Sequence, residues 1–147
     1  MTYLITGGAG FIGSNFVKHM LASHPQAELI ILDALTYAGN LGTLSEELKN
    51  SKVTFVKGDI CDREVVEKIF TDYKIDYVVN FAAESHVDRS IENPQLFLQV
   101  NVLGTQNLLD TEKKYWTTGK DENNYPIWRE GVKYLQVSTD EVYGSLG

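Results

Sequence analysis

The chain has 147 residues, 43% of them apolar and 11% aromatic, and this composition excludes disordered and fibrous protein classes. Its size is typical of one domain that buries a single core. The formal net charge of -7, with 20 acidic against 13 basic residues, argues against nucleic acid as a partner, because a phosphate backbone requires a basic face.

Five short runs rich in Val, Ile, Leu, Phe and Tyr alternate with stretches of helical periodicity. The predicted strands span residues 3–6, 28–32, 53–57, 77–81 and 133–138. Strands that alternate with helices are typical of βα units wound onto a parallel sheet. We therefore expect an α/β fold with a doubly wound parallel sheet, the Rossmann fold.

Apolar residues at helical spacing predict helices over 11–23, 62–73 and 94–116. The first helix should end before Pro25, where proline blocks continuation, and Asp62 and Asn93 are suitable N-caps for the other two. The polar, turn-rich stretch 117–131 is expected to form a surface excursion before the last strand.

A glycine-rich turn, Gly-Gly-Ala-Gly-Phe-Ile-Gly at 7–13, follows the first predicted strand and opens the first predicted helix. In a dinucleotide-binding turn, Gly7 or Gly8 permits the tight bend, Gly10 lets the backbone approach a pyrophosphate, and Gly13 lets helix and strand pack closely. The helix N-terminus then offers N–H donors and a partial positive charge. This context indicates nucleotide binding even in an acidic protein.

Asp33 ends the second predicted strand, twenty residues after Gly13. A carboxylate at this place would accept hydrogen bonds from the adenosine ribose hydroxyls and would repel a 2′-phosphate. The absence of arginine beside it favours NAD over NADP as the cofactor. The alternative is an aspartate that only caps the turn after the strand.

At the end of the third predicted strand, Gly58, Asp59 and Ile60 are placed to line an adenine pocket, and at the end of the fourth, residues 81–83 offer small side chains beside the cofactor. Ligands of open α/β sheets bind in the crevice outside the carboxyl ends of the strands, so these exits should face the same ligand as the glycine turn. For Ala82 and Ala83, close packing of helix on strand is an equally good explanation.

Several motifs together resemble the extended short-chain dehydrogenase/reductase family, and within it the dTDP-glucose 4,6-dehydratases. They are the glycine turn, residues 33–40, Ala-Ala-Glu-Ser-His-Val-Asp-Arg-Ser at 82–90 and Ser-Thr-Asp-Glu-Val-Tyr-Gly at 138–144. Besides the three glycines, the resemblance implies that NAD faces Phe11, Ile12, Asp33, Ala34, Leu35, Thr36, Asp59, Ile60, Phe81, Ala82, Ala83, Glu84, Ser85 and Val100. It implies further that Ser85 and Thr139 contact the nucleotide-sugar substrate, dTDP-glucose.

The resemblance also implies a catalytic triplet at Thr139, Asp140 and Glu141. A 4,6-dehydratase oxidises carbon 4 of the hexose, eliminates water across carbons 5 and 6, and returns the hydride to carbon 6. Asp140 would donate a proton to the leaving hydroxyl, Glu141 would remove the carbon 5 proton, and Thr139 would bind the carbon 4 oxygen. On pattern alone, adjacent acids after a strand are more often solvated loop residues.

The family places a Tyr-x-x-x-Lys pair and a substrate-binding lobe beyond this triplet, and neither lies within the 147 residues. We therefore expect a truncated chain, one incomplete NAD-binding domain over 1–147, that by itself binds NAD weakly and has no activity. The alternatives are an epimerase or decarboxylase of the same family, which needs no acidic pair, and a non-catalytic NAD-binding module.

The remaining expectations concern location and partners. One cysteine rules out an intrachain disulfide, no apolar stretch approaches the ~18 residues of a membrane span, and no signal segment is recognisable. We expect a cytoplasmic protein without a membrane partner. His86 has no nearby second histidine, so no metal site is expected. Members of the family commonly form homodimers, and the helix beginning at Pro94 is a candidate interface, with core packing an equally good explanation of its apolar face.

Overall fold

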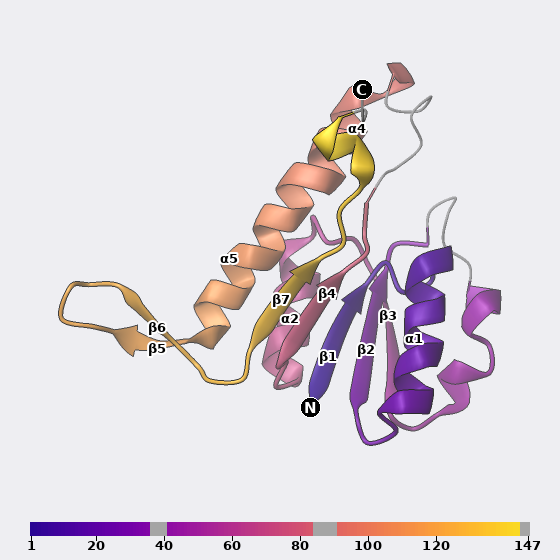
Figure 1. Cartoon of the computed structure of the whole chain (residues 1–147), viewed down its shortest axis with the longest axis horizontal. Helices are drawn as coiled ribbons and strands as arrows, with labels where there is room; N and C mark the ends of the chain where they lie inside the picture. Colours follow the sequence, from indigo (N-terminus) through magenta and orange to yellow (C-terminus); the bar gives the residue numbers. More distant parts are fainter. Residues whose placement is uncertain (36–40, 84–90, 145–147) are drawn as a thin grey trace.

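A five-stranded parallel sheet forms the centre of the computed structural model, which describes residues 1–35, 41–83 and 91–144, without the side chains of Asp140 and Glu141 (Figure 1). The strand order is β3-β2-β1-β4-β7. The strands are β1 (Thr2–Thr6), β2 (Glu28–Asp33), β3 (Val53–Lys57), β4 (Tyr77–Asn80) and β7 (Lys133–Gln136). All four pairings are parallel, which confirms the predicted sheet with strand ends shifted by at most two residues.

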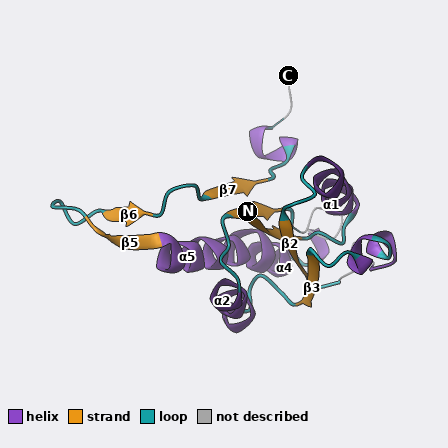
Figure 2. Cartoon of the chain, turned by 90° about the horizontal axis from the view of Figure 1, so that it is seen from below, coloured by secondary structure: helices purple, strands orange, loops and turns teal. Residues whose placement is uncertain are grey.

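Helices cover both faces of this sheet, as the doubly wound prediction requires. Helix α1 (Phe11–Ser23) packs on one face, and α2 (Arg63–Asp72) and α5 (Thr105–Trp116) pack on the other (Figure 2). Alternation along the strands supplies both cores. Leu4 and Ile30 join the core beneath α2 and α5, whereas Ile5 and Ile31 join the core beneath α1.

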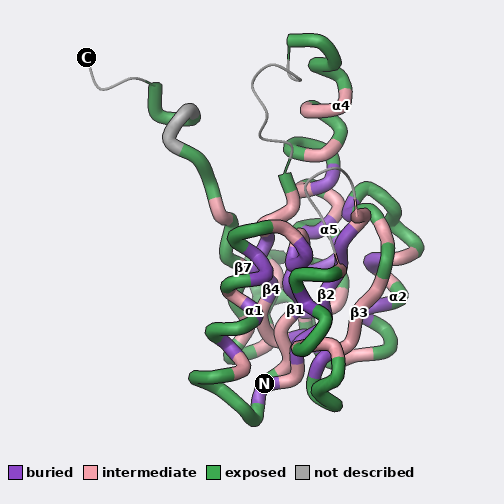
Figure 3. The backbone as a smooth tube through the Cα atoms, turned by 90° about the vertical axis from the view of Figure 1, so that its right-hand side faces the viewer, coloured by how far each residue is buried: buried purple, intermediate pink, exposed green. Residues whose placement is uncertain are grey.

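Burial follows this layering. The interior strands β1 and β2 are mostly buried, whereas β7, at the edge of the sheet, is exposed at three of its four residues (Figure 3). A strand covered on both faces needs apolar residues at consecutive positions, which explains the unbroken run from Leu29 to Leu32 in β2.

The predicted helix caps are present. The Asp62 side chain accepts hydrogen bonds from the Glu64 and Val65 amides and starts α2, and the Asn93 side chain accepts one from the Leu96 amide. Helix α1 begins without a side-chain cap, because its N-cap is Gly10. Its first turn therefore keeps N–H groups without a side-chain acceptor.

The stretch from Pro94 to Trp116 is helical throughout but not uniform, which corrects the prediction of a single α-helix. It consists of α4 (Pro94–Leu98), a π-helical segment (Gln99–Gly104) and α5. A Cβ atom at Gly104 would lie 2.6 Å from the Ile60 side chain, so this segment packs closely against the loop after β3. Contact with that loop accompanies the change in winding, and π segments of this kind are frequent at functional sites.

The predicted surface excursion contains an antiparallel hairpin that was not predicted. It is formed by β5 (Thr117–Lys120) and β6 (Pro126–Trp128), and it projects away from the sheet (Figure 1). The Asp121 side chain accepts hydrogen bonds from two turn amides, and Asn124 has a φ of 66°. Asparagine tolerates this left-handed conformation, which closes the turn.

Three short 3₁₀ segments complete the described secondary structure, at Leu41–Leu44, Glu47–Lys49 and Asp140–Tyr143. Within the described ranges, each helix is too short or too polar to cross a membrane.

Candidate functional site

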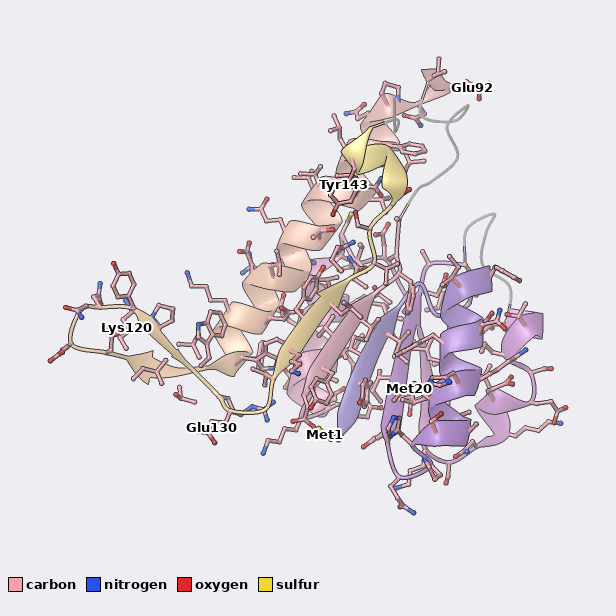
Figure 4. All side chains as sticks on the ribbon, viewed as in Figure 1. Met1, Met20, Glu92, Lys120, Glu130 and Tyr143 are labelled. Atoms are coloured by element: carbon pink, nitrogen blue, oxygen red, sulfur yellow. The ribbon has the colours of Figure 1, made fainter. Side chains whose placement is uncertain are left out.

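The carboxyl ends of the strands are held level by hydrogen bonds that extend just beyond the strands themselves. The Gly7 amide donates to the Leu32 carbonyl at 2.8 Å, and the Phe81 amide donates to the Thr6 carbonyl at 2.9 Å. On the outer strands, the Gly58 amide donates to the Asp33 carbonyl at 3.0 Å and the Val137 amide to the Asn80 carbonyl at 3.1 Å. All five strand exits therefore lie at one end of the sheet. Figure 4 shows Tyr143 at this end and Met1 at the opposite end.

The glycine turn fits tightly between β1 and β4. Gly7 has a φ of +69°, and a Cβ atom there would lie 2.7 Å from the Ala82 amide nitrogen. A Cβ atom at Gly13 would lie 2.3 Å from the Gly7 carbonyl oxygen. Of the two glycines that the sequence left open for the bend, Gly7 has the positive φ, and Gly13 permits a close contact between the helix and the turn. The turn leads directly into the N-terminus of α1, which has no acidic residue in its first turn.

Asp33 lies beside this turn and is 9% exposed. Its Oδ2 atom accepts a hydrogen bond from the Ala9 amide at 2.9 Å, and its Oδ1 atom accepts one from the Leu35 amide at 2.7 Å. The carboxylate therefore ties the glycine turn to the end of β2. Each oxygen retains one further lone pair, so both structural and ligand contacts are available to the same side chain.

A cavity of about 140 Å³ opens beside the glycine turn and Asp33. Four strand exits and the helix after Pro94 contribute to its wall. The residues that line it are Gly7, Gly10, Leu32, Asp33, Ala34, Gly58, Asp59, Ile60, Phe81, Ala82, Ala83, Leu96 and Val100. Ten of the residues predicted to face NAD are thus brought together around one cavity.

Local hydrogen bonds fix the loop after β3 in this wall. The Asp59 side chain accepts a hydrogen bond from the Cys61 amide at 2.8 Å. The Asn107 side chain of α5 donates to the Ile60 carbonyl at 2.6 Å. These contacts hold Asp59 and Ile60 at the rim of the cavity.

The triplet predicted to be catalytic follows β7 at the same end of the sheet. Thr139 is exposed, and the backbone from Asp140 to Tyr143 forms a 3₁₀ turn in which the Val142 amide donates to the Thr139 carbonyl at 3.3 Å. β4 lies between β7 and the β1 strand that carries the glycine turn. With strands about 4.8 Å apart, the two turns begin about 10 Å from each other. The Asp140 and Glu141 side chains lie outside the described part of the structure.

Comparison with known protein families supports the same reading of these motifs. The model of the family described as GDP-mannose 4,6 dehydratase matches residues 4–147, nearly the whole chain. The chain belongs to the GDP-mannose 4,6 dehydratase family. The matched residues include the glycine turn, Asp33 and the turn after β7.

Three relatives within this comparison carry one name. The dTDP-glucose 4,6-dehydratase of Xanthomonas campestris pv. campestris is 50% identical over 146 residues, which cover 99% of this chain and 40% of the relative. A solved structure of the dTDP-glucose 4,6-dehydratase of Streptomyces venezuelae, with NAD bound, matches with a TM-score of 0.83 and 43% identity. The match covers all of this chain and 42% of that one. The NAD complex of the Bacillus anthracis enzyme matches with a TM-score of 0.80 and 44% identity, again over all of this chain and 40% of the other.

The chain spans about 40% of the length of the curated relatives that it matches. What this member of the GDP-mannose 4,6 dehydratase family holds is therefore the part that contains the glycine turn, the cavity and the acidic turn.

Some predicted site residues are not in the cavity wall of this family member. Phe11 and Ile12 are 83% and 63% exposed at the start of α1, and Gly13 and Leu35 are absent from the lining. Leu35 instead packs against the core beneath α1, with a φ of 55°. Thr36, Glu84 and Ser85 lie outside the described residues.

Two lining residues were not predicted, Leu32 and Leu96, whereas Gly58 was expected in the wall from its place after the third strand. Leu96 and Val100 are four residues apart on one helical run, so the prediction for Val100 already contained the signal for Leu96. Leu32 directly precedes Asp33, but its apolar side chain is indistinguishable in sequence from other core residues. Among the described residues, no group of three or more His, Cys, Asp or Glu side chains is placed to hold a metal ion.

Proposed function

We propose that this chain is the NAD-binding part of a nucleotide-sugar 4,6-dehydratase that converts dTDP-glucose into dTDP-4-keto-6-deoxyglucose. One observation carries the proposal: the glycine turn, Asp33 and the Asp140–Tyr143 turn all follow carboxyl ends of one parallel sheet. Ligands of such sheets bind at that end. The names of the matched relatives and the NAD in two of their structures support both the activity and the cofactor.

The residues around the cavity fit a dinucleotide. The N-terminus of α1 offers amide donors to a diphosphate, and Gly7 leaves no side chain between the turn and Ala82. Each Asp33 oxygen keeps a lone pair that can accept a hydrogen bond from a ribose hydroxyl. A carboxylate in this place would repel a 2′-phosphate. The cavity is smaller than the roughly 300–1,000 Å³ of pockets that enclose a drug-sized ligand, so we infer that it receives one half of the dinucleotide.

When bound, NAD supplies the acceptor and later the donor of the hydride. The protein must then move protons at the sugar. Oxidation of carbon 4 makes the carbon 5 proton acidic, so Glu141 removes it while Asp140 protonates the leaving hydroxyl on carbon 6. Thr139 donates a hydrogen bond to the carbon 4 oxygen, and Ser85 also contacts the substrate. This division of labour needs one protonated and one ionised carboxyl group.

The test is conversion of dTDP-glucose by the complete gene product that contains this sequence, in the presence of NAD. The expected result is a 4-keto-6-deoxy product with solvent hydrogen incorporated at carbon 5, because elimination passes through loss of that proton. A 4-epimerised sugar with its carbon 6 hydroxyl intact would instead assign the chain to an epimerase. Absence of any product would overturn the enzymatic proposal.

Substitution of the acidic pair tests the residue roles. Asp140→Asn and Glu141→Gln should each lower kcat by about 10²- to 10⁴-fold, the usual contribution of general acid–base groups. Glu122→Gln, on the exposed hairpin turn, is the matched control and should leave kcat unchanged. Full activity in both pair variants would remove them from the mechanism.

We also propose a cytoplasmic homodimer. Support for the dimer comes from an exposed apolar stripe along the helix after Pro94, formed by Leu98, Val102, Leu103 and Leu109, with exposed fractions of 44–60%. Support for the location comes from the single cysteine, Cys61. Light scattering of the complete gene product should give the mass of two chains, and Leu103→Glu should reduce it to one.

A further inference from the structure

A polar cluster with a buried centre joins the cofactor cavity to β7, and the proposed mechanism does not use it. At its centre is Asn80, the last residue of β4, with no exposed surface. Thr6, also fully buried, is its register partner on β1, and Gln136 is its partner on β7. In a parallel sheet such partners point to the same face, so the three side chains form a row across the sheet.

Every hydrogen-bonding position of the Asn80 amide has a partner. The Oδ1 atom accepts hydrogen bonds from the Thr6 hydroxyl at 2.5 Å and from the Ala82 amide at 3.1 Å. The Nδ2 atom donates to the Gln136 Oε1 atom at 2.8 Å and to the Tyr134 hydroxyl at 3.2 Å. Tyr134 and Gln136 also hydrogen-bond to each other. Because Asn80 and Thr6 are fully buried, a displacement of the Asn80 amide would leave a buried group unpaired, so these bonds hold the amide in place.

The two ends of this network have different tasks. On the Oδ1 side, Ala82 lines the cavity proposed for NAD. On the Nδ2 side, Tyr134 and Gln136 belong to β7, and the chain reaches Thr139 three residues after Gln136. Asn80 is therefore a single side chain in contact with both the wall of the cofactor cavity and the strand that carries the acidic turn.

Among the described residues, β7 pairs with β4 through parallel ladder hydrogen bonds. The side-chain bonds from Asn80 to Gln136 and Tyr134 add a second connection between these two strands. The place of β7 relative to the cavity wall thus depends on β4 and on the side-chain bonds from Asn80.

We propose that Asn80 is a positioning residue, which holds the strand before Thr139 at a fixed place relative to the cofactor wall at Ala82. The proposal rests on the proposed dehydratase function, because only then must the Thr139 turn and the cofactor cavity act on the same sugar. Reacting groups must be held closely, since a misplacement of about 1 Å can cost about a hundredfold in rate.

The experiment is a double-mutant cycle in the complete gene product. Asn80→Ala removes the link, and Gln136→Leu removes its acceptor on β7. Each should lower kcat by about tenfold to a hundredfold with less than a threefold change in the Kd for NAD. The double variant should be no slower than Asn80→Ala alone, because both changes cut the same link.

Two matched variants separate positioning from general loss of stability. Gln136→Glu keeps an oxygen that accepts from Asn80, so it should restore most of the activity lost in Gln136→Leu. Thr6→Val breaks the bond to β1 but leaves the link between Ala82 and β7, so it should lower the unfolding temperature while kcat stays within about twofold.

An active parent protein whose kcat is unchanged by Asn80→Ala and Gln136→Leu would overturn this role, and so would effects that multiply in the double variant. If the parent protein gives no 4-keto product, the proposed function fails instead. The two failures are therefore distinguishable.

Discussion

At the scale of single residues, the glycine turn and the end of β2 depend on unusual backbone geometry. Gly7 and Leu35 both have positive φ values, of 69° and 55°. For a leucine this conformation costs roughly 1–2 kcal/mol, which the surrounding structure must offset. The Asp33 carboxylate connects the two segments, because it accepts hydrogen bonds from the amides of Ala9 and Leu35. One side chain thus helps to hold both segments in place.

Gly7→Ala should destabilise the chain, both by steric overlap and by its backbone conformation. The alanine Cβ would meet backbone atoms of Phe81 and Ala82 at 2.7 Å, and the φ of +69° is unfavourable for any side chain. We expect the free energy of unfolding to fall by about 1–3 kcal/mol and NAD binding to be lost. Urea unfolding and calorimetric titration with NAD measure the two effects. Gly119→Ala is the control, because no heavy atom lies within 4 Å of its new Cβ, and unchanged stability in both variants would contradict the argument.

Asp33→Asn should be destabilising although it keeps the shape of the side chain. Asp33 uses both oxygens to accept backbone hydrogen bonds, and an amide has only one oxygen, so one buried N–H loses its acceptor. The expected loss in unfolding free energy is about 1–3 kcal/mol. Asp121→Asn provides the contrast, because the two turn amides there share the single Oδ1 atom, which asparagine retains. Equal losses in urea unfolding of the two variants would disprove this explanation.

At the scale of elements, the sequence predicted those helices and strands that depend on neighbouring residues, but not those features that depend on contacts between distant residues. The strands β1 and β2 and the caps Asp62 and Asn93 follow from runs of apolar residues and from side chains next to the helix starts, and both were predicted. The π-helical segment was not, because it accompanies contact between Gly104 and Ile60, which lie 44 residues apart in the chain. Periodicity contains no information about such a contact.

The hairpin and the cavity also differ in how far neighbouring residues specify them. The hairpin turn depends on Asp121 and on Asn124 in a left-handed conformation, a local signal that was present but was read only as a loop. The cavity residues were predicted in large part, because strand ends meet at one edge of a parallel sheet. What the sequence could not provide was the strand order, which places β4 between the glycine turn and Thr139.

Helix α5 contains a charged residue on its inner face that no sequence pattern identified. Glu112 lies between Leu108 and Trp116 on the row that faces the sheet, is 3% exposed, and its Oε1 atom has no hydrogen-bond partner among the described residues. Burial raises the pKa of this carboxyl to about 8. Near neutral pH the group is therefore protonated in the folded chain and ionised in the unfolded chain.

This makes the packing of α5 pH-dependent. Because the folded pKa lies above the unfolded one, stabilisation by the bound proton is complete at low pH and is lost as the pH rises through about 8. Between about pH 5 and pH 8 the stability advantage of Glu112→Gln over the parent should grow by about 1.4 kcal/mol per pH unit. Urea unfolding at several pH values measures it. Glu130→Gln, at an exposed position, is the control, and a constant difference between Glu112→Gln and the parent would contradict the assignment.

At the scale of the whole molecule, the two ends of the sheet have separate tasks. The carboxyl end holds the cavity and the acidic turn, whereas the amino end joins the N-terminus to the hairpin exit. There the Asp76 carboxylate accepts hydrogen bonds from the Thr2 amide at 2.9 Å and from the Arg129 guanidinium at 2.8 Å, and the same guanidinium donates to the Ile75 carbonyl. This cluster stabilises the fold at a distance from the site.

Asp76→Asn should consequently weaken the fold and leave NAD binding intact. Burial alone would raise the pKa of Asp76, but the hydrogen bonds from Arg129 and the Thr2 amide outweigh it and hold the pKa below its ordinary value. Such a group stabilises the fold above its unfolded pKa, and this contribution disappears as the pH falls through the lower, folded pKa. We expect Asp76→Asn to lower the free energy of unfolding by about 1–3 kcal/mol at neutral pH, and by progressively less in acid.

The matched control is Glu46→Gln, which breaks the ion pair between Lys49 and Glu46. The side chains of this pair are 72% and 79% exposed. Glu46→Gln should therefore change the free energy of unfolding by less than about 1 kcal/mol. Asp76 and Arg129 are only 20% and 25% exposed, so water screens their interaction less. Urea unfolding at neutral and acidic pH measures the stability of Asp76→Asn, and calorimetric titration measures its Kd for NAD. A weakened Kd for NAD in Asp76→Asn, at unchanged stability, would mean that the amino end of the sheet is coupled to the site through the strands, and the separation of tasks argued from the fold would be wrong.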